Sequence, residues 1–112
     1  MRLWLTTPQT ISQQLYRQGA ITEEEMASHP QKNLITRAVG VRADVETDVS
    51  EITLLPGDRI LCASDGLTNF VMSAQLAEIL ADDDFYKIPQ KLIEAALTHN
   101  ATDNITAVVL EY

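Results

Sequence analysis

The sequence contains a single cysteine, and it has no long apolar run. Cys62 cannot form a disulfide within the chain, and its place in an apolar stretch fits a reducing compartment. We therefore expect a cytoplasmic protein. No stretch approaches the ~20 apolar residues of a membrane span, and "MRLWLTTPQT" is too short and too polar for a secretory leader. These absences argue against disulfide-stapled, secreted and membrane-spanning proteins.

Basic residues are also scarce. Asp and Glu number 16 against 8 Lys and Arg, which gives a formal net charge of −8. The bases form no cluster along the chain, so most of the surface would repel a phosphate backbone and we expect no nucleic-acid partner. The acidic balance is compatible with cation binding, although ordinary solubility also explains it.

What the sequence does contain is typical of one globular domain. Its 112 residues are 46% hydrophobic and 21% charged, with only 4 Gly and 4 Pro. The patterns along the chain predict helices, then strands, then helices, then a last strand. That order indicates an α+β fold, an antiparallel sheet packed with helices, rather than alternating β-α-β units.

Two short helices are predicted near the start. In "TISQQLYRQG" (10–19) an apolar side is followed by a glycine stop, and in "TEEEM" (22–26) Thr22 and Glu25 have the spacing of a capping box. The apolar side consists of Ile11, Leu15 and Tyr16. From Asn33 the period changes, and we expect a strand over 33–40 and a half-exposed strand over 45–55.

The C-terminal part is more strongly patterned. "PGD" (56–58) predicts a tight turn, and "RILCAS" (59–64) is apolar enough for a strand covered on both faces, with Cys62 buried in it. Ser73 is expected to cap a helix over 74–80, and Pro89 to start a second helix. The inward residues of that second helix are Leu92, Ile93, Ala96 and Leu97, and a buried strand, "NITAVVLEY" (104–112), ends the chain.

Two aspartates stand at the ends of these apolar strands. Asp65 directly follows the first strand, and Asp103 precedes the last one in "NATDNITAVVL" (100–110). If the strands are antiparallel neighbours, the end of one lies beside the start of the other, and both carboxylates meet at one rim of the sheet. Carboxylates brought together repel, and a divalent cation removes that repulsion. The pattern therefore predicts a cation site.

Mg²⁺ or Mn²⁺ would suit this rim, because both take oxygen ligands and Mg²⁺ accepts one or two carboxylates beside waters and substrate phosphates. Gly66 would let backbone or solvent approach closely, and the Asn104 amide could orient Asp103. The alternative is that Asp65 and Asp103 are turn and strand-end residues that satisfy local amides. Spacing alone leaves both interpretations open.

The same stretches resemble a known family. "GDRILCASDGLTNF" (57–70) and "TDNITAVVL" (102–110) look like the two C-terminal signature motifs of the metal-dependent type-2C (PPM) Ser/Thr protein phosphatases, particularly the bacterial branch. "GAITEEEMASHPQKNLITRAVG" (19–40) is similar to the flap segment and following strand of those enzymes. The resemblance runs from Leu5 onward, but family members commonly carry Asp-His-Ser where this chain has Pro8, Gln9 and Thr10.

The resemblance implies a function. In that family, the aspartates matching Asp65 and Asp103 are ligands of a two-metal centre, usually Mn²⁺ or Mg²⁺, with Gly66 and Asn104 beside them here. A metal-bridging water attacks the phosphorus of a phosphoserine or phosphothreonine in a protein substrate, without a phosphoenzyme intermediate. Two cations ~3.5 to 4 Å apart lower the pKa of that water and neutralise charge on the phosphoryl oxygens.

It also implies that residues 1–112 form a single partial domain, half of the family's β-sandwich, with 19–40 as its flap-like segment. The family's phosphate-gripping arginine, Glu-Asp pair and Asp-Gly-x-Gly-Gly loop have no counterpart in the chain. We therefore expect no catalytic residue in this chain alone and no activity from it in isolation. A truncated gene product, a deliberately shortened piece or a degenerate relative would all look like this. A non-catalytic phosphatase-like interaction module is the alternative function.

Half a sandwich leaves a sheet face uncovered, so we expect a homo-oligomer built through that face. Other residues have a functional and a structural interpretation. His99 could reach the rim of Asp103 or cap a helix, and His29 is expected at a helix end. Arg37 and Arg59 could contact phosphate, but near strands we expect them to be ion-paired or surface residues, and we assign them no catalytic role. The run Asp82 to Asp84 lacks the ligand spacing of a calcium loop.

Overall fold

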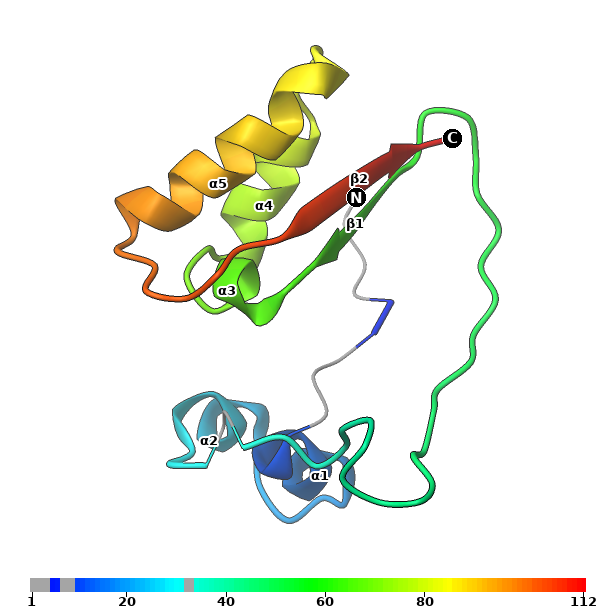
Figure 1. The fold of residues 1–112 in the computed structure, drawn as a ribbon, viewed down its shortest axis with the longest axis vertical. Helices are drawn as coiled ribbons and strands as arrows, with labels where there is room; N and C mark the ends of the chain where they lie inside the picture. Colours follow the sequence, from blue (N-terminus) through cyan, green and yellow to red (C-terminus); the bar gives the residue numbers. More distant parts are fainter. Residues whose placement is uncertain (1–4, 7–9, 32–33) are drawn as a thin grey trace. The chain divides into compact units, whose positions relative to one another are not determined.

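The computed structural model of the chain describes residues 5–6, 10–31 and 34–112. They fall into two units, one within Leu3–Glu51 and one over Ile52–Tyr112, and each is described by itself (Figure 1). The described residues form five α-helices, one 3-10 helix and a two-stranded antiparallel sheet. The α+β class expected from the sequence is therefore confirmed. No helix in the described ranges is both long and apolar enough to cross a bilayer.

The first unit contains the two short helices that the sequence predicts, α1 (Ile11–Arg17) and α2 (Glu23–Ser28). Each begins at a threonine whose hydroxyl accepts a backbone N–H, from Gln13 to Thr10 at 3.1 Å and from Glu25 to Thr22 at 3.2 Å. These bonds satisfy N–H groups that the first turn of a helix leaves without a partner. After α1 the chain turns at Gly19, whose φ of 74° suits glycine.

The buried side of α1 differs from the prediction. Ser12 and Gln13 are its buried residues, whereas Tyr16 is exposed. The Ser12 hydroxyl lies 3.2 Å from that of Thr10, so the polar groups on this side bond to one another. A helix buries whichever face its neighbours cover, and here the chain at Leu34, whose carbonyl accepts the Ile11 N–H at 2.9 Å, lies beside the start of α1.

The strands expected over 33–40 and 45–55 are not formed in the described residues. Residues 34–43 hold only isolated bridges, Thr10 with Ile35 and Val39 with Arg42, and 44–55 contain no helix or strand. An alternating pattern makes a strand only where a second strand accepts its hydrogen bonds, and no such partner pairs with 45–55 within the described ranges. Asn33, together with Pro8 and Gln9, lies outside the described residues.

The second unit is built on β1 (Arg59–Ala63) and β2 (Ala107–Glu111), which pair antiparallel with Leu61 opposite Val109. Before β1, Gly57 makes the predicted tight turn, with a φ of 92°. Between the strands come α3 (Asp65–Thr68), α4 (Ser73–Leu80), a 3-10 helix (Phe85–Lys87) and α5 (Ile88–Thr98). Figure 1 shows α4 and α5 side by side against the sheet. The core consists of Leu67, Val71, Leu76, Ile88, Leu92, Ala95 and Ala96, with Leu61, Ala107 and Val109 packed on it.

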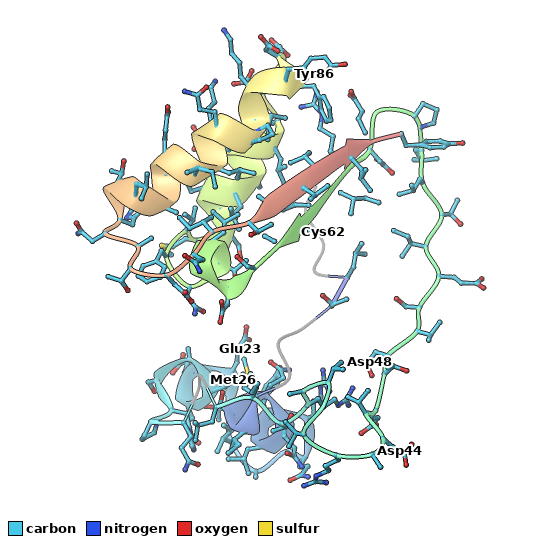
Figure 2. All side chains as sticks on the ribbon, viewed as in Figure 1. Glu23, Met26, Asp44, Asp48, Cys62 and Tyr86 are labelled. Atoms are coloured by element: carbon cyan, nitrogen blue, oxygen red, sulfur yellow. The ribbon has the colours of Figure 1, made fainter. Side chains whose placement is uncertain are left out.

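Within the described part of the second unit the helices cover one face of the sheet, so the expectation that the strand of "RILCAS" is covered on both faces, with Cys62 buried in it, is wrong. Val108 and Leu110 are 52% and 54% exposed, and Cys62, which pairs with Val108, is exposed as well (Figure 2). These side chains alternate with Leu61 and Val109, so they point to the opposite face. Within the described part of the second unit the helices pack on the other face alone.

The helices of this unit follow the sequence with two local differences. Pro89 lies in the first turn of α5, as expected, and Leu92 and Ala96 are fully buried. Leu97, however, is exposed and Ala95 is buried in its place, because the covered stripe lies slightly to one side of the predicted one. Ser73 is the first residue of α4 rather than its cap, since the chain already turns into the helix at Met72.

Candidate metal centre

The pairing of β1 with β2 brings the two aspartate-bearing turns to the same end of the sheet. Ala63, the last residue of β1, lies opposite Ala107, the first of β2. Pairing continues one step further, because the Ser64 N–H donates to the Thr106 carbonyl at 2.9 Å and the Thr106 N–H donates to Ser64 Oγ at 3.0 Å. The antiparallel arrangement assumed for the predicted cation site is therefore present. Ser64 was not singled out from the sequence, although its place directly before Asp65 could have indicated a role in positioning that turn.

Asp65 is the first residue of α3. Its side chain is exposed, and its position in the first turn suits a negative charge, because the unpaired N–H groups there carry partial positive charge. Its backbone carbonyl accepts the Asn69 N–H at 2.9 Å, which closes the short helix. Leu67, fully buried two residues later, anchors the turn in the core. The fold thus holds the backbone of Asp65 in place while leaving its carboxylate at the surface.

Gly66 is the point where the two turns touch. A Cβ built at this position would lie 1.9 Å from the carbonyl oxygen of Asn104 and 3.5 Å from Cα of Ile105. Both atoms belong to the backbone, so a side chain could not displace them without moving the chain. Because Gly66 has no side chain, the backbone of Asn104 and Ile105, which follows Asp103, can lie directly against it.

Asp103 is exposed and lies in a bend before β2. Its Oδ1 accepts the backbone N–H of Asn104 at 2.7 Å. This bond fixes the orientation of the carboxylate, and it is made by the backbone amide of Asn104. It is also the kind of local contact that a purely structural aspartate makes. Asp103 therefore lies directly before Asn104, whose backbone carbonyl contacts Gly66.

The donor set fits a hard divalent cation only in part. Two exposed carboxylates at one end of a sheet supply oxygen ligands, which Mg²⁺ and Mn²⁺ prefer. Within the ranges that the structure describes, no three His, Cys, Asp or Glu side chains come together as a metal-binding group. Two carboxylates suit a site whose remaining positions are taken by water, by phosphate or by ligands from elsewhere.

The two histidines lie at helix ends. His99 is the C-terminal cap of α5, and its Nε2 lies 2.9 Å from Oε1 of Gln75. His29 caps α2, and its Nδ1 accepts the Gln31 N–H at 3.0 Å. For both residues the contacts correspond to the structural interpretation.

The two arginines considered from the sequence are ion-paired, as expected. Arg37 pairs with Asp48 at 3.0 Å and with Glu46 at 3.4 Å. Arg59 pairs with Glu111 at 3.4 Å, and its Nη1 donates to the carbonyls of Leu80 and Asp82. In the acidic run, Asp82 pairs with Lys91, and Asp84 accepts the Tyr86 N–H at 3.2 Å to start the 3-10 helix.

Comparison with known proteins decides the family. The chain is 35% identical over 108 residues to the serine/threonine phosphatase stp of Listeria innocua, a match that covers 96% of this chain and 43% of that protein. The structure of the Streptococcus agalactiae serine/threonine phosphatase matches with a TM-score of 0.87 and 39% identity, covering 96% of this chain and 46% of that one. This chain corresponds to the C-terminal part of the type-2C bacterial Ser/Thr phosphatases. No protein-family model matches it.

The match is to the C-terminal part of the type-2C phosphatases, and the chain spans less than half the length of the curated relatives. A further neighbour, the catalytic domain of the phosphatase PstP, was solved in complex with 2 manganese ions. It has a TM-score of 0.73 and 33% identity, and the match covers 96% of this chain and 44% of that one. The fold class and the family expected from the signature motifs are thus confirmed.

Proposed function

We propose that this chain contributes Asp65 and Asp103 as ligands to a Mn²⁺ or Mg²⁺ centre of a protein Ser/Thr phosphatase. The observation that carries the proposal is the backbone contact between Gly66 and Asn104, which holds the two aspartate-bearing turns against each other in a chain of this family. The substrate class is proteins carrying phosphoserine or phosphothreonine, and the reaction is hydrolysis of the phosphate monoester.

The chain's own residues position the ligands. The paired hydrogen bonds between Ser64 and Thr106 hold the end of β1 against the start of β2. The Asn104 N–H orients the Asp103 carboxylate, and α3 fixes the backbone of Asp65. When bound, divalent cations lower the pKa of a coordinated water and neutralise charge on the phosphoryl oxygens.

The proposed centre is incomplete in this chain, since two carboxylates are too few to hold the metal ions of such an enzyme. We therefore assign no catalytic residue to the chain alone and expect no turnover from it in isolation. Residues 1–112 act as one partial domain in this proposal, with 19–40 as a flap-like segment. The single cysteine supports a cytoplasmic location. The uncovered sheet face around Val108 and Leu110 supports self-association.

Calorimetric titration with Mn²⁺ tests the ligand assignment. The wild-type chain should bind Mn²⁺ weakly, and Asp65→Asn and Asp103→Asn should each abolish the binding, because each removes half of the charged ligands. Asp83→Asn is the matched control, since it removes the same charge from an exposed residue of the second unit. Equal Mn²⁺ binding by all four proteins would exclude Asp65 and Asp103 as ligands.

A chimera tests the activity. Residues 1–112 would replace the matching C-terminal segment of the Listeria innocua relative, and hydrolysis of a chromogenic phosphate ester and of a phosphoserine protein would be followed with Mn²⁺. We expect Mn²⁺-dependent turnover that Asp65→Asn and Asp103→Asn abolish and that Asp83→Asn leaves intact. A folded chimera without turnover would contradict the proposed activity. Turnover by the unfused chain would contradict its proposed inactivity.

A further inference from the structure

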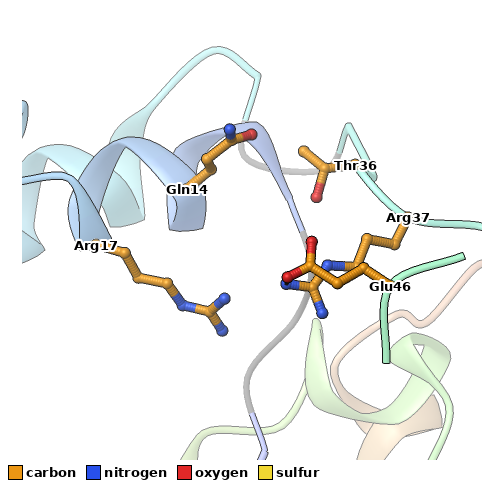
Figure 3. A pocket seen from close by; sticks show the side chains of 5 residues that line it. All are labelled: Gln14, Arg17, Thr36, Arg37 and Glu46. Carbon is orange, nitrogen blue, oxygen red and sulfur yellow. The ribbon is translucent and has the colours of Figure 1, made fainter. Parts of the chain in front are cut away.

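The first unit contains a cavity with two arginines in its wall. The cavity measures about 180 Å³ and is lined by Gln14, Arg17, Thr36, Arg37 and Glu46. Figure 3 shows the Arg17 side chain reaching toward the Arg37–Glu46 pair, with Gln14 and Thr36 along the wall. A water takes a share of ≈ 30 Å³ in the liquid, so the space exceeds that of a few waters and accommodates a tetrahedral anion.

The wall is more basic than the chain as a whole. It carries two of the 8 basic residues of a chain whose net charge is −8, against one acid among the lining residues, Glu46. A second acid, Asp48, is not among the lining residues but pairs with Arg37. The Arg37 side chain is only 19% exposed. Guanidinium groups bind phosphate oxygens through paired N–H donors, and two of them match a doubly charged phosphate group.

The carboxylate of Glu46 already occupies one donor of this site. Glu46 Oε1 lies 3.4 Å from Arg37 Nη2, while Asp48 Oδ1 pairs with Arg37 Nη1 at 3.0 Å. The Glu46 side chain is 76% exposed and belongs to a stretch, 44–50, without helix or strand. An exposed pair of this length contributes little to stability, so Glu46 can leave while Asp48 keeps Arg37 in place.

We propose that this cavity binds a phosphate group, in the position now taken by the Glu46 carboxylate, between the guanidinium groups of Arg17 and Arg37. Thr36 and Gln14 supply further hydrogen-bond donors in the wall. This proposal rests on the proposed function, because a protein phosphatase binds phosphate groups both on its substrate and as its product. All the residues that line the cavity belong to the first unit, and Asp65 and Asp103 are not among them. In this proposal the cavity acts as a docking site rather than as the reacting centre.

The test is a binding titration of the complete chain in buffer with a chelator and no divalent cation, followed through the arginine side-chain N–H signals in ¹⁵N NMR. Three probes are compared, namely a short neutral peptide with one phosphoserine, the same peptide without the phosphate, and inorganic phosphate. We expect saturable binding of the phosphate-bearing probes only, and the tighter of the two identifies the source of the phosphate. Absence of saturable binding overturns the proposal.

Matched variants locate the binding. Arg17→Gln should weaken it about tenfold, the effect of losing one charge-assisted contact, whereas Arg42→Gln, which removes an exposed arginine outside the cavity wall, should change it less than about twofold. Equal effects of the two overturn the proposal. Circular dichroism confirms that each variant is folded.

Glu46→Gln should strengthen phosphate binding, whereas Arg17→Gln should weaken it. It removes the competing carboxylate, so binding should tighten about fivefold, while Glu51→Gln, which removes the same charge outside the wall, should change it less than about twofold. Equal effects of these two substitutions contradict displacement of Glu46. Because this titration contains no divalent cation, a failure of phosphate binding is distinguishable from a failure of Mn²⁺ binding at Asp65 and Asp103.

Discussion

Gly66 and Asn104 meet backbone to backbone. The Asn104 carbonyl oxygen lies 1.9 Å from the position that a Cβ at residue 66 would occupy, so nothing larger than hydrogen fits on Gly66. The contact joins the start of α3 to the turn before β2 and therefore connects the segments that carry Asp65 and Asp103. One residue without a side chain thus sets the geometry of the candidate metal centre.

Gly66→Ala should lower the free energy of unfolding by about 3 kcal/mol or more, because the added methyl group overlaps backbone that cannot rotate away. Gly57→Ala is the control. It has open space but a φ of 92°, and should cost only about 1 kcal/mol of conformational strain. Urea unfolding followed by circular dichroism measures both, and equal losses would contradict the contact.

Leu92→Ala and Leu97→Ala should differ sharply although they lie in the same helix. Leu92 is fully buried, so its truncation leaves a cavity and should cost about 3 kcal/mol of unfolding free energy. Leu97 is 58% exposed, and its truncation should stay within about 0.5 kcal/mol. Thermal and urea unfolding of the two variants check this, and a large loss for Leu97→Ala would mean that its face is covered in solution.

The Asp82–Lys91 ion pair should make stability depend on pH at both extremes. The hydrogen bond from Lys91, followed by the N–H of Asp84, lowers the pKa of Asp82 below 3.8, and the same bond raises the pKa of Lys91 above 10.5. The stabilisation from Asp82 is present above its unfolded pKa and is lost as pH falls through the lowered folded value. The stabilisation from Lys91 is present below its unfolded pKa and is lost as pH rises through its raised folded-state pKa.

Comparison of the wild type with Asp82→Asn checks the acid limb. Between about pH 5 and about pH 3, the urea midpoint of the variant should fall less than that of the wild type. The difference should shrink at high salt, because the Lys91 side chain is 45% exposed and salt ions can reach the pair. An identical acid limb in the two proteins would show that the pair does not form in solution.

The uncovered sheet face should drive self-association of the isolated chain. Light scattering should show wild-type oligomers, and Leu110→Glu or Val108→Lys should shift the chain toward the monomer, because each places a charge on the exposed apolar face. Tyr86→Glu, at an exposed residue of the 3-10 helix, is the matched control and should leave the oligomer intact. A monomeric wild type would contradict self-association.

Features that depend on neighbouring residues were predictable from the sequence. The Thr22 cap, the turn at Gly57 and the start of α5 at Pro89 all follow from contacts within a few residues. Burial was not predictable in the same way. Cys62 and Leu97 have apolar side chains and lie in apolar stretches of the sequence, yet both are exposed. Burial requires a second surface to cover the side chain, and the local sequence pattern does not specify that surface.

The sequence by itself determined the α+β order, most helix boundaries and the positions of Asp65 after β1 and of Asp103 before β2, since propensity, capping and hydrophobic period act over short distances. Only the tertiary structure decided which sheet face is covered and that Gly66 meets Asn104. It likewise decided that Arg17 and Arg37 share a cavity. These features join residues far apart in the chain, and their free energy comes from packing that exists only after folding.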